Sequence, residues 1–365
     1  MINAITENKY NMELMEALNK DWETHPFHKN IPIYTHEAQI ETGEMRLRKL
    51  EKIVELDGKK ILEIGGGLGY TSYAIARHTS AEVICIDIRK HPEWERMKLK
   101  NLRFENIDLS AENPFRENEF DLIISFVAWE HMRHPFEMLQ QAAFVLKVGG
   151  AFYLHANLYR GPSASHLYRV IFFPWPHLLF EKKLMIEYAK KKGVSDEFIA
   201  WFCDVNKLTL SEYKEYFEKL NLNIVKEERS KFPIDWEFYF RFYDQLSLYP
   251  IYDLETDFFS VFLEKTANVE IKSRILISKP SIGSGDTVPI YIGEPIMVNA
   301  RIYTAHCELA WYVILDGVVI ERWWYTQPPK IIFYPEKAGT YIFRCFARKN
   351  KMVEYMDSDK IVVEV

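Results

Sequence analysis

The chain lacks several features that would place it at a membrane or outside the cell. It has no apolar run long enough to span a bilayer, and Met1 to Lys9 is polar, unlike the core of a signal peptide. The formal net charge is only −6, with acidic and basic residues interspersed. We therefore expect a cytoplasmic protein with no transmembrane segment and no electrostatic attraction to nucleic acid.

Cysteine is scarce as well. The four cysteines among 365 residues have no Cys-x-x-Cys spacing, which argues against a cysteine metal site. Cys307 and Cys345 flank Trp311, an order that also occurs in disulfide-bonded immunoglobulin domains. We favour two buried thiols over a disulfide, because a cytosolic compartment keeps thiols reduced.

The most informative feature present is a short apolar strand that runs into a glycine-rich turn. The turn contains Gly65, Gly67 and Gly69, and a helix is expected from about Thr71. Glycine lets backbone N–H groups come close to a ligand, so we expect a side chain on any of the three to block that approach.

Acidic residues end the next two apolar runs. Asp87 follows one run and Asp108 the other, and the carboxyl ends of parallel strands form the ligand crevice of an open sheet. An acid about 20 residues after the glycines suits ribose hydroxyls. A nicotinamide cofactor is the alternative, but Tyr70 departs from its Gly-x-Gly-x-x-Gly fingerprint and Glu63 precedes the first glycine by two residues.

Five ordered motifs resemble those of class I S-adenosylmethionine-dependent methyltransferases of the type-11-like group, over roughly residues 45 to 266. They are Glu63-x-Gly65-x-Gly67-x-Gly69, Asp87, Asp108, the run Phe120 to Ser125, and the run Leu146 to Gly150. The resemblance implies S-adenosylmethionine as the cofactor. The alternative is a degenerate fold that keeps its glycines for packing only.

The same resemblance implies which residues bind the cofactor. The implied residues are Glu63, Gly65, Gly67, Gly69, Asp87, Asp108, Leu109 and Ser125. Glu63 and the glycines would hold the methionine end and Asp87 the ribose hydroxyls. Asp108 and Leu109 would border the adenine.

The length suggests more than one domain, and the expected fold class is α/β: a doubly wound, mostly parallel, Rossmann-like sheet followed by a C-terminal all-β sandwich. The expected parts are a leader or lid (1–44), a methyltransferase domain (45–267) with an acceptor-site insert (157–205), and an immunoglobulin-like β-sandwich (271–365).

Helical periodicity predicts a helix over Met45 to Leu56 and another over Pro135 to Leu146, which Gly149-Gly150 would end before a strand from Ala151. In the insert, the aromatic segment Phe172 to Phe180 is either a lid that shapes the acceptor site or a plug that caps the core.

The C-terminal part has short β-rich runs, and Asp316-Gly317 predicts a hairpin. Its cluster Trp323-Trp324-Tyr325 cannot all point inward, because neighbours on a strand face opposite sides. The outward ring either stacks on sugars or packs on the catalytic domain.

Catalytic residues are expected just after the fourth strand, where the resembling methyltransferases carry a Glu-His pair. Here that pair is Glu130-His131, and His131 is the expected general base, the alternative being a histidine that only packs there. Some quinone O-methyltransferases add a metal-binding acid three residues earlier; that position is Val127, so we expect no metal. His155 and His166 are reserve candidates for the base.

The expected acceptor is a sugar hydroxyl of a glycan, lipid-linked or not, or of a nucleotide sugar. The combination of a methyltransferase domain, this insert and a C-terminal β-sandwich resembles enzymes of bacterial surface polysaccharide biosynthesis. The first alternative is a lipid, quinone or other small metabolite, with the aromatic insert as an apolar wall. The second is a glycan-binding or assembly protein with a vestigial methyltransferase domain. The sequence predicts no oligomeric state.

Overall fold

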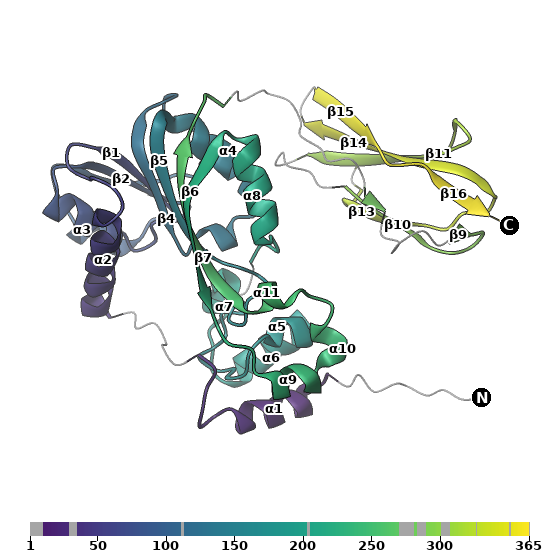
Figure 1. The fold of residues 1–365 in the computed structure, drawn as a ribbon, viewed down its shortest axis with the longest axis horizontal. Coiled ribbons are helices and arrows are strands. Elements are labelled where there is room, and N and C mark those ends of the chain that lie inside the picture. Colours follow the sequence, from purple (N-terminus) through teal and green to yellow (C-terminus); the bar gives the residue numbers. More distant parts are fainter. Residues whose placement is uncertain are drawn as a thin grey trace. The chain divides into compact units, whose positions relative to one another are not determined.

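The computed structural model describes residues 10–28, 35–110, 113–202, 205–269, 281–282, 290–300, 307–325, 327–349 and 352–364. The chain divides into two compact units, Met1–Val269 and Glu270–Val365 (Figure 1). Parts of the predicted leader, and Cys203, lie outside the described residues. Among the helices of those ranges, none has the length and apolar character that crossing a membrane requires.

The first unit is built on a seven-stranded sheet in the order β3-β2-β1-β4-β5-β7-β6. Neighbouring strands pair in parallel from β3 to β5, whereas β7 is antiparallel to both β5 and β6. The strands are β1 Lys60–Ile64, β2 Glu82–Asp87, β3 Leu102–Asn106, β4 Phe120–Phe126, β5 Leu146–Asn157, β6 Leu222–Lys231 and β7 Thr256–Lys265. The central strands β1, β2 and β4 are mostly apolar because both of their faces are buried. The predicted α/β fold class is confirmed.

Helix α2 corrects the predicted start of the methyltransferase helix. It spans His36–Glu51 rather than Met45 to Leu56, and the Thr35 side chain caps it by accepting from the backbone N–H of Ala38. The helix packs on α3 (Tyr70–His78) through Gly43, where a Cβ would lie 2.4 Å from the Tyr70 carbonyl oxygen. Because this contact is made by a glycine, the first turns of α2 have no stripe of apolar residues. Hydrophobic periodicity therefore could not predict them.

The junction of α4 and β5 also differs from the prediction. Helix α4 spans Pro135–Val145, and β5 begins directly at Leu146. Gly149 and Gly150 therefore lie inside the strand, where Gly149 has φ +76° and the pairing with β4 shifts register. The glycines mark a strand irregularity and not a helix end.

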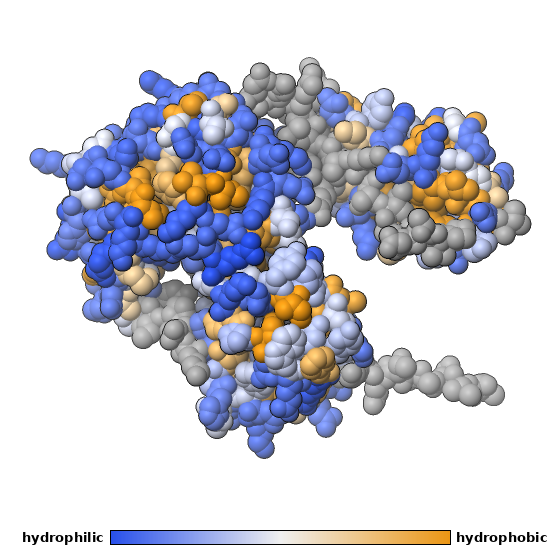
Figure 2. All heavy atoms as spheres, viewed as in Figure 1, coloured by the Kyte–Doolittle hydropathy of each residue, from blue (hydrophilic) through white to orange (hydrophobic). Residues whose placement is uncertain are grey.

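A helical lobe with its own apolar core completes the first unit. Its helices are α1 Met12–Asp21, α5 Pro176–Leu179, α6 Lys182–Lys191, α7 Asp196–Phe202, α9 Trp236–Arg241, α10 Tyr243–Leu246 and α11 Ile251–Leu254. Phe173, Trp175 and Phe180 of the aromatic insert are buried in this core, as a plug would be. Figure 2 shows further apolar residues at the lobe's surface, where Phe240 and Leu248 are exposed.

Part of the predicted leader belongs to this lobe. Asn19 of α1 donates from Nδ2 to the Tyr188 hydroxyl (2.7 Å), and its Oδ1 accepts from the backbone N–H of Phe172 (2.7 Å). The described part of the leader therefore packs as structure and is not an irregular segment.

The second unit is all β, as predicted. A three-stranded sheet (β13-β10-β8) and a six-stranded sheet (β12-β11-β14-β16-β9, with β15 on β14) share one apolar core. The strands are β8 Ser281–Ile282, β9 Ile290–Tyr291, β10 Ile296–Asn299, β11 Glu308–Leu315, β12 Val318–Trp323, β13 Lys330–Phe333, β14 Gly339–Lys349, β15 Met352–Asp357 and β16 Ile361–Glu364. The predicted hairpin at Asp316-Gly317 joins β11 to β12, and both turn residues have positive φ. Cys345 is a buried free thiol, so the alternative disulfide is excluded.

Candidate active site

The expected site residues gather where the strand order reverses. Strand β1 lies between β2 and β4, so the glycine turn after β1 and the turn after β4 emerge at the same edge of the sheet. The two turns touch: a Cβ on Gly65 would lie 2.5 Å from the Ala128 Cβ. Ligand contacts from both turns can therefore meet in one crevice.

The three glycines have different reasons to be glycine. A Cβ on Gly69 would lie 2.3 Å from the Phe104 ring, and one on Gly65 would meet Ala128, so these two allow protein packing. Gly67 (φ +53°) differs from the other two because no atom lies within 4 Å of its Cβ position. A side chain there would extend into open space. A cofactor can therefore lie against Gly67, and ligand contact at Gly65 and Gly69 stays a prediction.

Asp87 and Trp94 hold the Gly67 peptide in place. The Gly67 N–H donates to Asp87 Oδ2 (2.9 Å), and the Trp94 indole N–H donates to the Gly67 carbonyl (2.9 Å). Trp94 also stacks on Phe104 with ring centroids 5.2 Å apart. Asp87 thus lies beside the open turn, as a ribose-binding acid should. Sequence reasoning missed Trp94, which stands in a short 3₁₀ helix with no motif around it.

Glu63 and Ser125 are buried within the protein. Glu63 Oε2 accepts from the backbone N–H (3.0 Å) and hydroxyl (2.5 Å) of Ser72, and burial raises the pKa of this carboxyl. The Ser125 hydroxyl donates to the Ile64 carbonyl (2.9 Å) and joins β4 to β1. These contacts brace the glycine turn from within the fold, and direct contact of either residue with a cofactor stays a prediction.

Asp108 and Leu109 follow edge strand β3. Asp108 is exposed and its Oδ1 accepts from the backbone N–H (3.0 Å) and hydroxyl (2.6 Å) of Ser110, whereas Leu109 is buried. The structure leaves their predicted place at the adenine untested.

Helix α2 brings a cation to this edge that sequence reasoning did not identify. Arg46 donates to the Thr71 hydroxyl (3.1 Å), and its guanidinium lies 4.8 Å from the centre of the Phe126 ring. Burial raises the pKa of both Glu63 and Glu130, and the positive charge of Arg46 lowers it by a smaller amount. Arg46 belongs to no motif, so nothing in the sequence marked it as a residue of the site.

Glu130, His131 and His166 form a cluster after β4. One nitrogen from each histidine and one carboxylate oxygen all lie within 4.8 Å of one another, and the two imidazole centroids are 5.0 Å apart. Glu130 is 1% exposed, and neither carboxylate oxygen has a hydrogen-bond partner. Burial raises the pKa of this carboxyl to about 8. The backbone amides of Glu130 and Asn157 oppose that shift, but they do not reach hydrogen-bond geometry with either oxygen. His166, named only as a reserve base, is thus a neighbour of the predicted pair.

The turn that carries this pair is held by Asn206, the residue that follows the insert. The Asn206 N–H donates to the Glu130 carbonyl (2.6 Å), and Asn206 Nδ2 donates to the Trp129 carbonyl (2.8 Å). The turn Trp129–His131 is therefore fixed by a residue that no motif marks.

His155 lies apart from this cluster. Its Nδ1 is 2.8 Å from the Ser260 hydroxyl, and its ring stacks on Phe258. Burial, aided by the charges of Lys49 and Arg46, lowers its pKa to about 4. The structure thus assigns His155 to the packing of β5 against β7.

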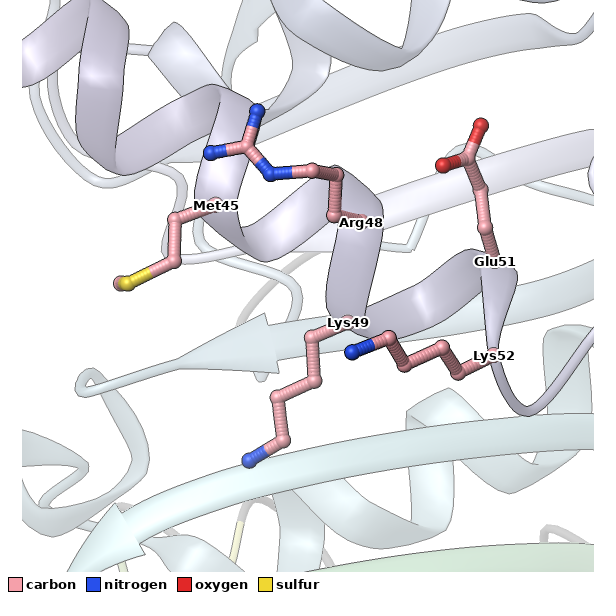
Figure 3. Close-up of a pocket in the computed structure, with 5 residues that line it drawn as sticks. All are labelled: Met45, Arg48, Lys49, Glu51 and Lys52. Atoms are coloured by element: carbon pink, nitrogen blue, oxygen red, sulfur yellow. The ribbon is translucent and has the colours of Figure 1, made fainter.

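A hollow of about 440 Å³ on α2 is separate from the predicted site residues. It is lined by Met45, Arg48, Lys49, Glu51 and Lys52, and Figure 3 shows all five side chains coming from that one helix and the residue after it. None of these residues was predicted to bind cofactor or acceptor.

Comparisons with known proteins find methyltransferases among the relatives of this chain. Residues 62–154 match a family model described as a methyltransferase domain. The ubiquinone biosynthesis O-methyltransferase of Coxiella burnetii is 27% identical over 178 residues, which cover 45% of this chain and 71% of that protein. The 2-methyl-6-phytyl-1,4-hydroquinone methyltransferase 1 of Oryza sativa is 31% identical over 143 residues, covering 38% of this chain and 42% of that one.

Among solved structures, an S-adenosylmethionine-dependent methyltransferase from Mesorhizobium loti has a TM-score of 0.42 at 14% identity, covering 62% of this chain and 99% of its own. The matched domain and the fold together define a class I methyltransferase. The protein is an S-adenosylmethionine-dependent methyltransferase, and S-adenosylmethionine is its cofactor.

Proposed function

We propose that the protein methylates a hydroxyl oxygen on a phenolic or hydroquinone ring. The observation that carries this proposal is the position of Glu130, His131 and His166 beside the glycine turn, where a hydroxyl acceptor must lose a proton. The names of the two curated relatives support the acceptor class. This choice favours the quinone alternative over the sugar acceptor that the sequence first suggested.

Different residues of this chain would bind the cofactor, accept the proton and position the acceptor. S-adenosylmethionine supplies an electrophilic methyl group. Asp87 and the Gly67 peptide would hold its ribose and methionine parts, because they border the open turn. A histidine nitrogen at His131 would accept the hydroxyl proton, and the insert (157–205) would position the acceptor. Positioning supplies much of the remaining rate in an in-line displacement.

A sugar acceptor remains a second candidate because of exposed aromatic rings on the C-terminal unit. Trp324 is 62% exposed and meets Tyr312 edge-on at 6.2 Å, whereas Trp323 packs against the core. Such a ring suits stacking on a sugar, and we propose that this unit is an immunoglobulin-like accessory of a polysaccharide-modifying enzyme. We also propose a cytoplasmic location, since Cys85 and Cys345 are free thiols.

An acceptor screen tests the two candidates. Formation of S-adenosylhomocysteine should be measured with short-chain hydroquinones and catechols on one side, and with nucleotide sugars and oligosaccharides on the other. Turnover on ring hydroxyls alone supports the main proposal, and turnover on sugars alone replaces it. With a long glycan, loss of rate in Trp324→Ala that a short glycan does not show would assign the ring to sugar binding.

The His131→Gln variant tests the chemistry at the cluster. The rate should fall by about 10²–10⁴-fold while affinity for S-adenosylhomocysteine stays unchanged, because the residues that hold the cofactor follow other strands. The matched control is His134→Gln, at a histidine three residues further along the chain whose Nδ1 lies 3.7 Å from Glu137 Oε2. A rate within a few-fold of wild type in His131→Gln would remove His131 from the reaction.

A further inference from the structure

We propose that Glu130, His131 and His166 form a binding site for a divalent transition-metal ion, for which zinc is the probe. In the part of the chain that the structure describes, these three are the one group of histidine, cysteine and acidic residues whose ligand atoms lie this close together. Two imidazole nitrogens and a carboxylate oxygen are a donor set that zinc and similar ions favour.

The spacing fits an ion after a small contraction. Ligand atoms at 2.0–2.2 Å from a tetrahedral ion are about 3.3–3.6 Å apart. The three atoms here lie within 4.8 Å of one another, so each pair must approach by at most about 1.5 Å to surround an ion. Three protein ligands leave a fourth position open, as in catalytic rather than structural zinc sites.

Glu130 supplies an independent reason for a ligand. Its carboxyl is almost completely buried, yet both oxygens lack a hydrogen-bond partner. Buried polar groups in native proteins nearly always have partners, and a carboxyl with none is unfavourable. A bound cation would displace the proton and be coordinated by a carboxylate oxygen of Glu130.

The backbone on either side of the cluster is held in unusual conformations. His166 has φ +55° and Val127, at the end of β4, has φ +53°. Such conformations persist in residues other than glycine where the surrounding structure enforces them, and they gather at functional sites.

Buried contacts fix the loop that carries His166. Asp257 accepts from the backbone N–H of Ser163 (3.0 Å) and from its hydroxyl (2.7 Å), and the Ser163 carbonyl accepts from the His166 N–H (2.9 Å). The side chains of Asp257 and Ser163 are buried. The histidine is therefore presented by a rigid loop, as a ligand of a preformed site must be.

This site revises the expectation that no metal binds. That expectation depended on Val127, because the spacing of the quinone-enzyme motif requires an acid there. His166 comes from a loop after β5, and only the fold brings it to the Glu130-His131 turn.

The catalytic role of the ion rests on the proposed function, whereas the binding of the ion to the cluster does not. An ion with an open position would coordinate the acceptor oxygen and lower the pKa of its hydroxyl. With the ion bound, His131 would be a ligand and the proton would pass to solvent.

The test is a zinc titration of the full-length protein in competition with a chromophoric chelator, without cofactor or acceptor. Wild type is compared with Glu130→Gln and with His166→Asn, since asparagine tolerates a positive φ. The matched control is His78→Ala, because His78 forms a comparable pair with Glu44 (2.8 Å) on the surface. Binding of S-adenosylhomocysteine by each variant confirms that it is folded.

We expect one zinc ion per wild-type chain, and at least about tenfold weaker binding in both site variants, with His78→Ala unchanged. No zinc binding by wild type, or wild-type affinity in folded His166→Asn, would overturn the site. Zinc binding that depends on the cluster, combined with no methylation of any hydroxyl acceptor, would overturn the proposed function alone.

Discussion

At the scale of single residues, Gly67 offers the sharpest test of the cofactor position. Gly67→Val should abolish binding of S-adenosylhomocysteine in calorimetry, because the new side chain would fill the open space beside the turn. Gly58→Val is the matched control: Gly58 also has positive φ (+69°) and no atom near a Cβ. Both variants should lose about 1–2 kcal/mol of stability from the left-handed backbone, but only the first should lose the ligand. Equal affinities in the two variants would contradict the placement.

His177 makes stability depend on pH. Its Nε2–H donates to the Tyr159 carbonyl (2.6 Å), its Nδ1 is buried without a partner, and burial lowers its pKa to about 4. Below its ordinary pKa of about 6.5 the unfolded chain binds a proton that the folded chain does not. The free energy of unfolding should therefore fall as the pH drops from 6.5 toward 4, by about 2 kcal/mol at pH 5 from this residue.

Urea unfolding at several pH values measures this effect. His177→Gln should flatten the acid dependence, whereas His25→Gln, at an exposed histidine, should leave it as in wild type. His155 adds a loss of the same sign, so part of the slope should remain in His177→Gln. An unchanged slope in that variant would show that the pKa of His177 is the same in the folded and unfolded states.

Residues that belong to a motif could be predicted from the sequence, and residues that act through tertiary contacts could not. Asp87 lies beside the glycine turn as expected, because strand ends converge in a parallel sheet. Trp94, Arg46 and Asp257 reach the site from separate elements, and their roles depend on hydrogen bonds that no local spacing encodes.

At the scale of elements, the packing of α2 on α3 depends on Gly43. Gly43→Val should lower the free energy of unfolding by about 1–3 kcal/mol, since its Cβ would meet the Tyr70 backbone and push the helices apart. Glu41→Val introduces the same side chain at an exposed position of α2 and serves as the control. Thermal unfolding of both variants measures the difference. Similar melting temperatures would mean that the helices separate there without cost.

Strands were easier to predict than helices in this protein. The central strands are long buried apolar runs between turn residues, so their positions followed from composition. The start of α2 was missed because its buried residues include only Gly43, Leu47 and Leu50. The start of β5 was misplaced because Gly149-Gly150 suits the break between a helix and a strand as well as an irregularity inside a strand.

At the scale of the whole molecule, the two units should be separable. A chain shortened to residues 1–269 should stay soluble and bind S-adenosylhomocysteine as the full chain does, because the sheet is complete at Lys265. The end point includes Asn268, which hydrogen-bonds Asn118 and Asn221 within the first unit. Calorimetry on both chains measures the affinities. Insolubility of the shortened chain would mean that the catalytic unit needs the β unit to fold.

The antiparallel strand β7 has a consequence for how the protein is made. It pairs with both β5 and β6, and it carries Asp257, which anchors the His166 loop through Ser163, 94 residues earlier in the chain. During synthesis on the ribosome, that loop has no anchor until β7 has emerged. Long-range closure of this kind slows folding, so the nascent chain must keep β5 exposed while about a hundred further residues are added. A nascent methyltransferase unit should therefore acquire its reaction centre in one late step.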